Sequence, residues 1–158
     1  MTTDTLRTAF GSYPTGVVAV CGMVAGERVG MAMSTFVPIS LDPPLVGVCV
    51  QRTSRTWPLL RTAERLGISV LAHHHAHAAR ALAARDGDRF AGIDLEFGDG
   101  TVHVAGSTAR LVCTVENEVD AGDHVLAVLR VHTASTTTGT EPLVFHRSAF
   151  VELAGSRR

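Results

Sequence analysis

The chain has 158 residues, of which 46% are hydrophobic and 18% charged, and its formal net charge at pH 7 is −1. This length suits one domain with a substantial core. The near-neutral charge gives no electrostatic case for binding nucleic acid or an anionic membrane, and the apolar runs are too short to span a bilayer. Because few residues are charged for a small domain, we expect another subunit to cover part of the apolar surface.

The N-terminal third is predicted to hold a short helix followed by strands. Residues 3–11 form the helix, which the sequence Tyr13-Pro14-Thr15-Gly16 ends. Three strands are predicted after it: residues 17–24, 29–36 and 45–50. A hairpin turn joins the first two, and Asp42-Pro43-Pro44 forms a rigid turn before the third. The third strand, LVGVCV, is apolar throughout and should be covered on both faces.

The rest of the chain is predicted to consist mainly of strands, with two short helices inserted between them. Helical turns are predicted over residues 56–62 and an alanine-rich helix over 76–85, with an irregular segment over 88–100. Strands are predicted over five ranges: residues 66–71, 102–104, 107–118, 124–134 and 144–153. This mainly β pattern, without sustained strand–helix alternation, favours a closed antiparallel barrel. We expect a single domain over residues 3–154 and a frayed tail over 155–158.

Two short runs of hydroxyl residues flank the apolar strand, Ser34-Thr35 before it and Thr53-Ser54-Arg55-Thr56 after it. Together with Arg52, the second run offers hydroxyls and two guanidiniums but no carboxylate. Such a set of donors suits a phosphate monoester. A polar loop that closes a hairpin is the alternative, and spacing alone leaves both open. Neither a Walker loop nor a GxGxxG motif is present.

Two turns are further candidates for a ligand site. Gly16 allows close approach of the backbone to a flat ligand, and Thr15 offers a hydroxyl, although an ordinary helix-to-strand turn also explains them. His124 follows the turn Gly122-Asp123 at the start of a strand. Its imidazole suits stacking on a cofactor or buffering a proton, or it is a half-exposed structural residue.

Four histidines lie within five positions: His73, His74, His75 and His77. Transition metals favour imidazole ligands. However, the cluster straddles a strand-to-helix junction, and neither CxxC nor HExxH spacing frames it. We therefore expect a solvated loop and no metal site.

The three cysteines, Cys21, Cys49 and Cys113, lie in apolar strands without CxxC spacing. An odd number of buried thiols, with no recognisable signal peptide, favours a reducing cytoplasm. No catalytic triad or usefully spaced carboxylate pair is visible. If the chain is an enzyme, a bound cofactor must supply the reaction chemistry.

Ordered motifs over most of the chain resemble the flavin reductase-like, FMN-binding split-barrel family, which includes the short-chain reductase components of two-component monooxygenases. The matching segments are FGSYPTGVVAV (10–20), GMAMSTF (30–36), ISLDPPLVGVCV (39–50), RTSRTW (52–57), ISVLA (68–72), DRFAGID (88–94), AGDHVLAVLRV (121–131) and EPLVFHRSAF (141–150). The resemblance implies a six-stranded antiparallel split β-barrel with Greek-key topology and a few short helices. It also implies a homodimer with the flavin at or near the subunit interface.

The resemblance also implies a set of flavin-binding residues. Three would lie beside the isoalloxazine ring: Thr15, Gly16 and Val17. Three would meet the ring and the ribityl chain: Met33, Ser34 and Thr35. The phosphate would be held by Ser54, Arg55 and Thr56, with Val50 and Gln51 alongside the flavin. Near the flavin or the nicotinamide nucleotide would lie Arg89 and Phe90, and His124 would orient the nicotinamide.

Three positions depart from the family pattern: Ser34 replaces a common Asn or Gln, His75 a frequent Gln, and Leu95 a frequent Trp. The last two bear on the preference for the hydride donor. The function implied is an NAD(P)H-dependent flavin reductase. It would pass hydride from NADH or NADPH to FMN or FAD and supply reduced flavin to a separate monooxygenase. The alternatives are a flavin-binding protein without turnover and a split-barrel oxidase with tightly bound FMN.

Overall fold

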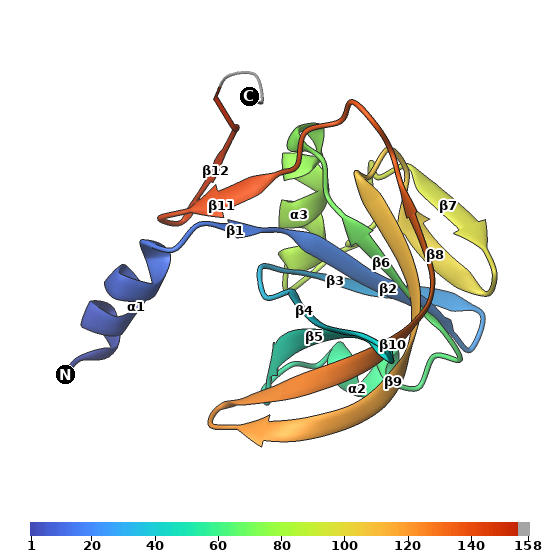
Figure 1. Cartoon of the computed structure of the whole chain (residues 1–158), viewed down its shortest axis with the longest axis horizontal. Coiled ribbons are helices and arrows are strands. Elements are labelled where there is room, and N and C mark those ends of the chain that lie inside the picture. Colours follow the sequence, from blue (N-terminus) through green and yellow to red (C-terminus); the bar gives the residue numbers. More distant parts are fainter. Residues whose placement is uncertain (155–158) are drawn as a thin grey trace.

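A seven-stranded antiparallel sheet forms the body of the protein, in a computed structural model that describes residues 1–154 (Figure 1). The strand order is β3-β2-β6-β9-β10-β5-β4. In that order the strands span Glu27–Met33, Val18–Val24, Leu66–Val70, Ala109–Ala121, His124–Thr136, Pro44–Gln51 and Val37–Leu41. The mainly β, antiparallel fold is therefore confirmed. The tail predicted over residues 155–158 lies outside the described residues.

The main sheet has one strand more than the six that were expected. The additional strand is β4, which pairs with β5 in the segment before the Asp42-Pro43-Pro44 turn. Pro38 lies within β4 and obscures its strand pattern, because proline cannot donate a ladder hydrogen bond. The position of β4 at the edge of the sheet explains why proline is tolerated there.

Two small sheets accompany the main one. β1 (Thr15–Gly16) pairs with β11 (Val144–His146), which pairs with β12 (Ala149–Val151). The strand predicted over residues 144–153 is thus a hairpin, whose turn places Arg147 and Ser148 at positive φ. β7 (Leu95–Gly98) pairs with β8 (Thr101–Val104) inside the segment that was predicted to be irregular.

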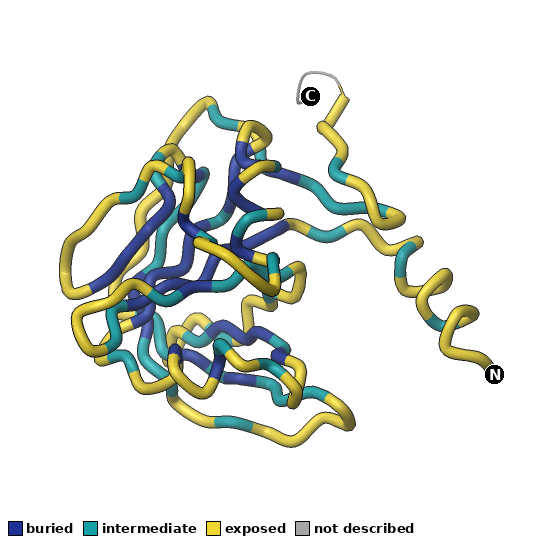
Figure 2. The backbone as a smooth tube through the Cα atoms, turned by 180° about the vertical axis from the view of Figure 1, so that it is seen from behind, coloured by how far each residue is buried: buried dark blue, intermediate teal, exposed yellow. Residues whose placement is uncertain are grey.

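Three helices connect or extend the sheets. α1 (Thr3–Gly11) has the predicted bounds, α2 covers Trp57–Leu60, and α3 covers Ala76–Ala83 after a 3₁₀ turn at His73–His75. In Figures 1 and 2, α1 stands away from the body beyond β1, and none of its residues is buried by the rest of the described chain. Within residues 1–154, no helix is long and apolar enough to cross a membrane.

Two hydrophobic cores lie on opposite faces of β2. Val18 and Val20 pack into the core inside the curved sheet, which α2 closes through Trp57 and Leu60. Alternate residues of β2 pack into the second core, beneath α3: Ala19 and Cys21. Because successive residues of a strand point to opposite faces, a strand covered on both sides is apolar throughout.

Candidate functional site

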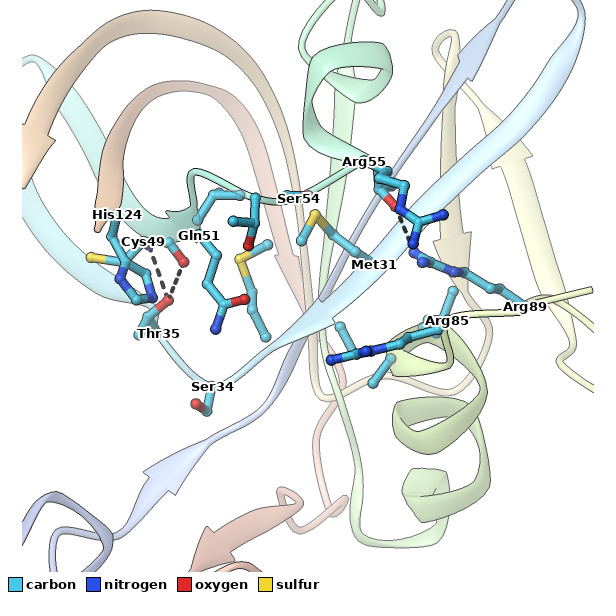
Figure 3. A pocket seen from close by; sticks show the side chains of 17 residues that line it. Met31, Ser34, Thr35, Cys49, Gln51, Ser54, Arg55, Arg85, Arg89 and His124 are labelled. Atoms are coloured by element: carbon cyan, nitrogen blue, oxygen red, sulfur yellow. Dashed lines mark hydrogen bonds between the residues drawn. The ribbon is translucent and has the colours of Figure 1, made fainter. Parts of the chain in front are cut away.

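A cavity of about 650 Å³ opens beside the end of β3, the end of β5 and the C-terminal end of α3 (Figure 3). We refer to it as the main cavity. Ten residues that the sequence predicted for the site line it: Met33, Ser34, Thr35, Val50, Gln51, Ser54, Arg55, Thr56, Arg89 and His124. The fold thus brings together segments from β3, β5, the loop after β5, the segment after α3 and the start of β10.

Four predicted residues do not line the main cavity of the single chain: Thr15, Gly16, Val17 and Phe90. Thr15 and Gly16 form β1 and pair with β11. The hydroxyl oxygen of Thr15 is buried and has no hydrogen-bond partner among the described residues. Val17 and Phe90 are buried in the core beneath α3.

Thr53, which belongs to the predicted hydroxyl run, lines the cavity as well, and the sequence reasoning missed six further lining residues: Met31, Ala32, Cys49, Leu82, Ala83 and Arg85. Met31 was detectable, because alternate residues of a strand share a face and Met33 was already predicted. No sequence pattern indicates Arg85, which comes from the segment after α3 and reaches the cavity through tertiary packing.

The loop between β5 and α2 carries hydroxyls whose protons are free to donate. The hydroxyl oxygen of Ser54 accepts a hydrogen bond from the Trp57 N–H at 3.1 Å, and that of Thr56 accepts one from Arg89 Nη1 at 2.7 Å. A hydroxyl has one proton and two acceptor positions. Both O–H groups therefore remain available to an anion in the main cavity.

The end of this loop is fixed to the sheet through α2. Trp57 Nε1 donates to Glu118 Oε1 at 2.8 Å, and Arg61 Nη2 donates to Glu118 Oε2 at 2.8 Å. Partial burial raises the pKa of Glu118, but these hydrogen bonds outweigh it and the net pKa is lowered. The carboxylate therefore stays ionised at neutral pH and holds the loop against β9.

Thr35 is fully engaged with the neighbouring strand. Its hydroxyl donates to the Cys49 carbonyl and accepts from the Cys49 N–H, both at 3.0 Å. Since a hydroxyl has a single proton, Thr35 has none left for a ligand. The side chain fixes the segment after β3 against β5, beside the main cavity.

Three arginines line the main cavity, and no carboxylate does so within the described residues: Arg55, Arg85 and Arg89. Arg89 is held by Thr56 and, at 3.3 Å, by the Gly30 carbonyl. Arg55 and Arg85 form no ion pair or side-chain hydrogen bond with any residue in 1–154. The predicted second guanidinium of the loop, Arg52, instead pairs with Asp120 at 2.8 Å and donates to the Gly122 carbonyl.

His124 lies opposite Gln51 in the β10–β5 ladder, and its side chain is about one third exposed. Its Nδ1 lies 2.7 Å from Asp123 Oδ1. An ionised carboxylate only accepts hydrogen bonds, so the proton is on Nδ1. The pKa of Asp123 is lowered by this hydrogen bond. The contact fixes the imidazole beside the main cavity.

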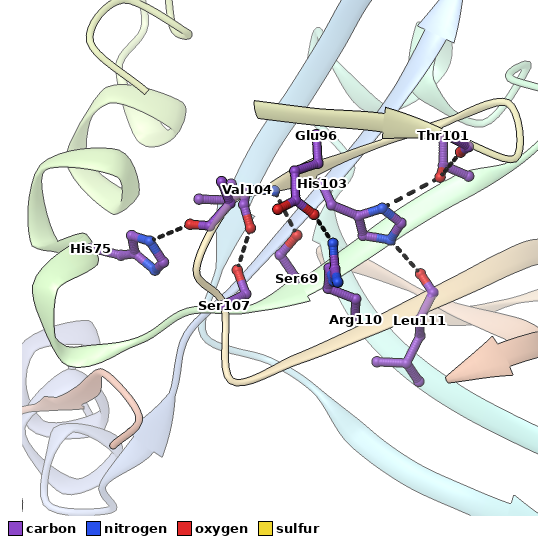
Figure 4. A network of polar contacts seen from close by, with 11 residues as sticks. Ser69, His75, Glu96, Thr101, His103, Val104, Ser107, Arg110 and Leu111 are labelled. Atoms are coloured by element: carbon purple, nitrogen blue, oxygen red, sulfur yellow. Dashed lines mark hydrogen bonds and ion pairs between the residues drawn. The ribbon is translucent and has the colours of Figure 1, made fainter. Parts of the chain in front are cut away.

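The histidine cluster bonds to the backbone of the fold. His75 is buried, unlike the solvated loop that was expected: its Nδ1 accepts from the Ala72 N–H and its Nε2 donates to the Ala105 carbonyl, both at 2.9 Å. Burial, with His74 and His73 nearby, lowers the pKa of His75. His77 donates to the Ala91 carbonyl at 3.1 Å. Figure 4 shows His75 beside a second polar network in which buried His103 contacts Thr101 and Leu111.

Comparisons with known proteins agree that the chain is similar to flavin reductases. A family model described as "Flavin reductase like domain" matches residues 10–154. The reductase subunit HsaB of a flavin-dependent monooxygenase from Rhodococcus jostii is 36% identical over 145 residues, covering 91% of this chain and 74% of that protein. A flavin reductase from Pseudomonas putida is 32% identical over 146 residues, covering 91% and 86%. The solved NADH:FAD oxidoreductase SgcE6 from Streptomyces globisporus, in complex with NAD and FAD fragments, is 32% identical, with a TM-score of 0.89 and coverage of 94% and 91%.

Proposed function

Since this chain belongs to the flavin reductase-like family, we propose that it is an NAD(P)H-dependent flavin reductase. It passes a hydride from a nicotinamide donor to FMN or FAD, and the reduced flavin then leaves for a separate flavin-dependent monooxygenase. The similarity to HsaB, the reductase subunit of a flavin-dependent monooxygenase, supports this role.

The chemistry of the main cavity fits a flavin phosphate. Its volume of about 650 Å³ lies within the usual range for ligand sites. The observation that carries the proposal is the set of unopposed donors around the loop after β5: the free O–H groups of Ser54 and Thr56 and the unpaired guanidinium of Arg55. Charge-assisted hydrogen bonds of this kind hold phosphate oxygens.

The remaining residues of the cavity would orient the reactants. Met31, Met33 and Val50 supply apolar surface for a flat ring, and Gln51 lies alongside. A bound flavin supplies the hydride-accepting chemistry. These residues would hold a flavin and its nicotinamide donor for transfer, and such positioning would provide most of the rate enhancement. We assign the orientation of the nicotinamide to His124, whose imidazole Asp123 fixes.

We also propose that two copies of the chain form a homodimer. Phe10 and Tyr13, in and just after α1, are 70% and 76% exposed, and Leu41 at the sheet edge is 97% exposed. Obligate homodimer interfaces are hydrophobic, so these exposed apolar side chains are suited to burial against a second subunit. Thr15 and Gly16 follow the same exposed segment and do not line the main cavity of their own chain. In a dimer, these two residues would reach the flavin ring in the cavity of the partner. Light scattering at micromolar concentration tests this, and a flavin-loaded monomer would contradict it.

The unpaired buried thiols support a cytoplasmic location. Cys21 and Cys113 are free and buried, and burial raises the pKa of each to about 12. A thiol with so high a pKa is a poor nucleophile and behaves as a small apolar side chain.

We place the whole unit, residues 3–154, in one domain.

Anaerobic mixing with NADH and, separately, NADPH tests the reductase function through flavin absorbance. Reduction of a large excess of free flavin supports it. Reduction of one equivalent only would indicate tightly held FMN that serves another substrate. Flavin binding without any reduction would indicate a binding protein, and either of these results would overturn the proposal.

A further inference from the structure

The side chain of Arg52, directly after β5, is bound to the turn that precedes His124. Its Nε donates to the Gly122 carbonyl at 2.8 Å, and its Nη2 lies 2.8 Å from Asp120 Oδ1. The backbone N–H of the same residue donates to the Asp123 carbonyl at 3.0 Å. A single residue thus holds the β9–β10 hairpin at its turn through both its side chain and its backbone.

Arg52 is not part of the lining of the main cavity. Its neighbours in the chain, Gln51 and Thr53, line the cavity, and Arg52 does not. Its charge is compensated by Asp120, so the guanidinium is poorly suited to a phosphate group. Any influence of Arg52 on a bound reactant therefore has to pass through the residues that it holds.

The turn receives its side-chain support from Arg52. Residues 122 and 123 connect β9 to β10, and Gly122 has a positive φ of 64°. Among the residues that the structure describes, Arg52 is the only one whose side chain donates to a backbone carbonyl of this turn. The Asp123 side chain is 95% exposed, so its position follows from the backbone that carries it.

The imidazole of His124 takes its position from the same turn. Its Nδ1 donates to Asp123 Oδ1 at 2.7 Å, and the side chain is about one third exposed. Figure 3 shows the imidazole at the end of the main cavity opposite Arg55 and Arg89. Because both the imidazole and the carboxylate that holds it belong to this turn, displacement of the turn would move the imidazole relative to the cavity.

We propose that Arg52 is a positioning residue for hydride transfer, which holds the turn of Gly122 and Asp123 so that the His124 imidazole stays beside the nicotinamide. This inference rests on the proposed reductase function and on the role proposed there for His124. Arg52 itself contacts neither reactant. Since Arg52 begins the loop after β5, one residue joins the loop that holds the phosphate to the turn that serves the donor.

Two measurements on Arg52→Ala test the positioning without turnover. In the flavin-free variant, the amides of residues 121–124 should exchange with deuterium faster than in the unmodified chain, because the turn has lost its side-chain bonds. Fluorescence titration should give unchanged affinities for FMN and riboflavin. Unchanged exchange would overturn the proposal, because Arg52 would then not hold the turn. A loss of affinity for FMN but not for riboflavin would also overturn it, because Arg52 would then bind the phosphate.

A double-mutant cycle with His124→Ala separates positioning from an independent effect. Arg52→Ala should lower kcat/KM for the nicotinamide donor about tenfold, which is less than the roughly 10²-fold that a displacement of about 1 Å can cost. In the His124→Ala background, the same substitution should change kcat/KM by less than about twofold, because the residue through which it acts is absent. Losses that multiply in the double variant would overturn the proposal.

Arg130→Ala is the matched control. Arg130 forms an ion pair with Glu116 at 2.6 Å on the same hairpin and lies outside the main cavity. Its removal should leave the exchange of residues 121–124, the flavin affinities and kcat/KM unchanged. Arg65→Ala, which removes an exposed guanidinium outside the cavity, controls for net charge. Melting temperatures show whether a loss reflects unfolding.

Reduction of FMN by the unmodified chain, with NADH and with NADPH, is measured in the same series. Its absence with both donors would refute the reductase function itself. If reduction proceeds and His124→Ala matches the unmodified chain, the reductase function stands and the positioning role of Arg52 is wrong.

Discussion

Arg89 donates from Nη1 to the hydroxyl oxygen of Thr56 at 2.7 Å and joins two segments that lie 33 positions apart in the sequence. The contact fixes the guanidinium at the edge of the main cavity and directs the Thr56 proton away from Arg89. Two motifs that the sequence offered separately, RTSRTW and DRFAGID, thus meet at one end of the main cavity.

Arg55→Ala should weaken FMN binding by about 1.5–3 kcal/mol, the usual contribution of a charge-assisted hydrogen bond. Riboflavin, which lacks the phosphate, should bind as before. Ser54→Ala should cost less, because it removes a neutral donor. Fluorescence titrations with both flavins measure the effect, with Arg65→Ala as the charge control. Unchanged FMN affinity in Arg55→Ala would place the phosphate elsewhere.

Thr35→Val should lower the free energy of unfolding by about 1–3 kcal/mol, since it removes two hydrogen bonds to Cys49 without changing the side-chain shape. Flavin affinity should fall as a consequence of the displaced loop. Chemical denaturation and flavin titration of one preparation measure both quantities. Thr133→Val, an exposed β10 substitution, is the control. A variant with parental stability would show that the two bonds contribute nothing.

His75 should make the protein less stable in acid. Its folded-state pKa is lowered, so the unfolded chain binds the proton more readily. The stabilisation is complete above the unfolded pKa of about 6.5 and is lost as the pH falls through the folded pKa. Denaturant midpoints between pH 8 and pH 5 should decline more for the parent than for His75→Gln. Parallel decline in the two proteins would argue against the assignment. The pKa values of Glu116, Glu118 and Asp123 are also lowered, but the stabilisation from these carboxylates is lost only below about pH 4.5.

His124→Ala should raise the KM for NAD(P)H or slow flavin reduction, while flavin affinity stays nearly unchanged. A contact made equally in the ground and transition states raises KM alone, and one made only in the transition state lowers kcat. Asp123→Asn, which removes the charge that fixes the imidazole, should show a weaker form of the same change. Stopped-flow reduction beside a melting curve measures these effects. Normal kinetics in His124→Ala would remove this residue from the site.

Chelator treatment should leave flavin reduction intact. Both ring nitrogens of His75 and Nε2 of His77 already bond backbone groups. Hydride transfer between nicotinamide and flavin also needs no ion. Activity measured before and after EDTA and dialysis checks this. Loss of activity that a single divalent metal restores would contradict it.

The sequence predicted the strands that bury apolar side chains and missed those that do not. β5 and β6 are runs of buried residues, and their ranges agree with prediction to within one residue at each end. β7 is almost entirely exposed, and its alternation of Leu95 and Phe97 with other residues covers only four positions. β4 is mostly exposed and contains Pro38. Both strands are short, with four or five residues each, and an alternation over so few positions does not distinguish a strand from a loop, which is why both were missed.

The site was predictable where a motif holds several donors in one loop. Ser54, Arg55 and Thr56 lie together in the chain and remain together in the cavity. Arg85 follows an alanine-rich helix and joins them only because α3 packs against β2 and β3. The engagement of Thr35 with Cys49 also depends on tertiary pairing, so the sequence could not show that its hydroxyl proton is used within the sheet.

β2 is buried on both faces, and one of these faces supports the helix beside the main cavity. One wall of the main cavity is the end of α3, and α3 rests on the core that Ala19 and Cys21 enter from β2. The opposite side chains of the same strand fill the core inside the sheet. An outward movement of the helix to admit a bulky ligand would therefore expose the core beneath it. We therefore expect a ligand of the main cavity to enter and leave through its solvent-facing mouth, and the amides of β2 should be among the last to exchange with deuterium.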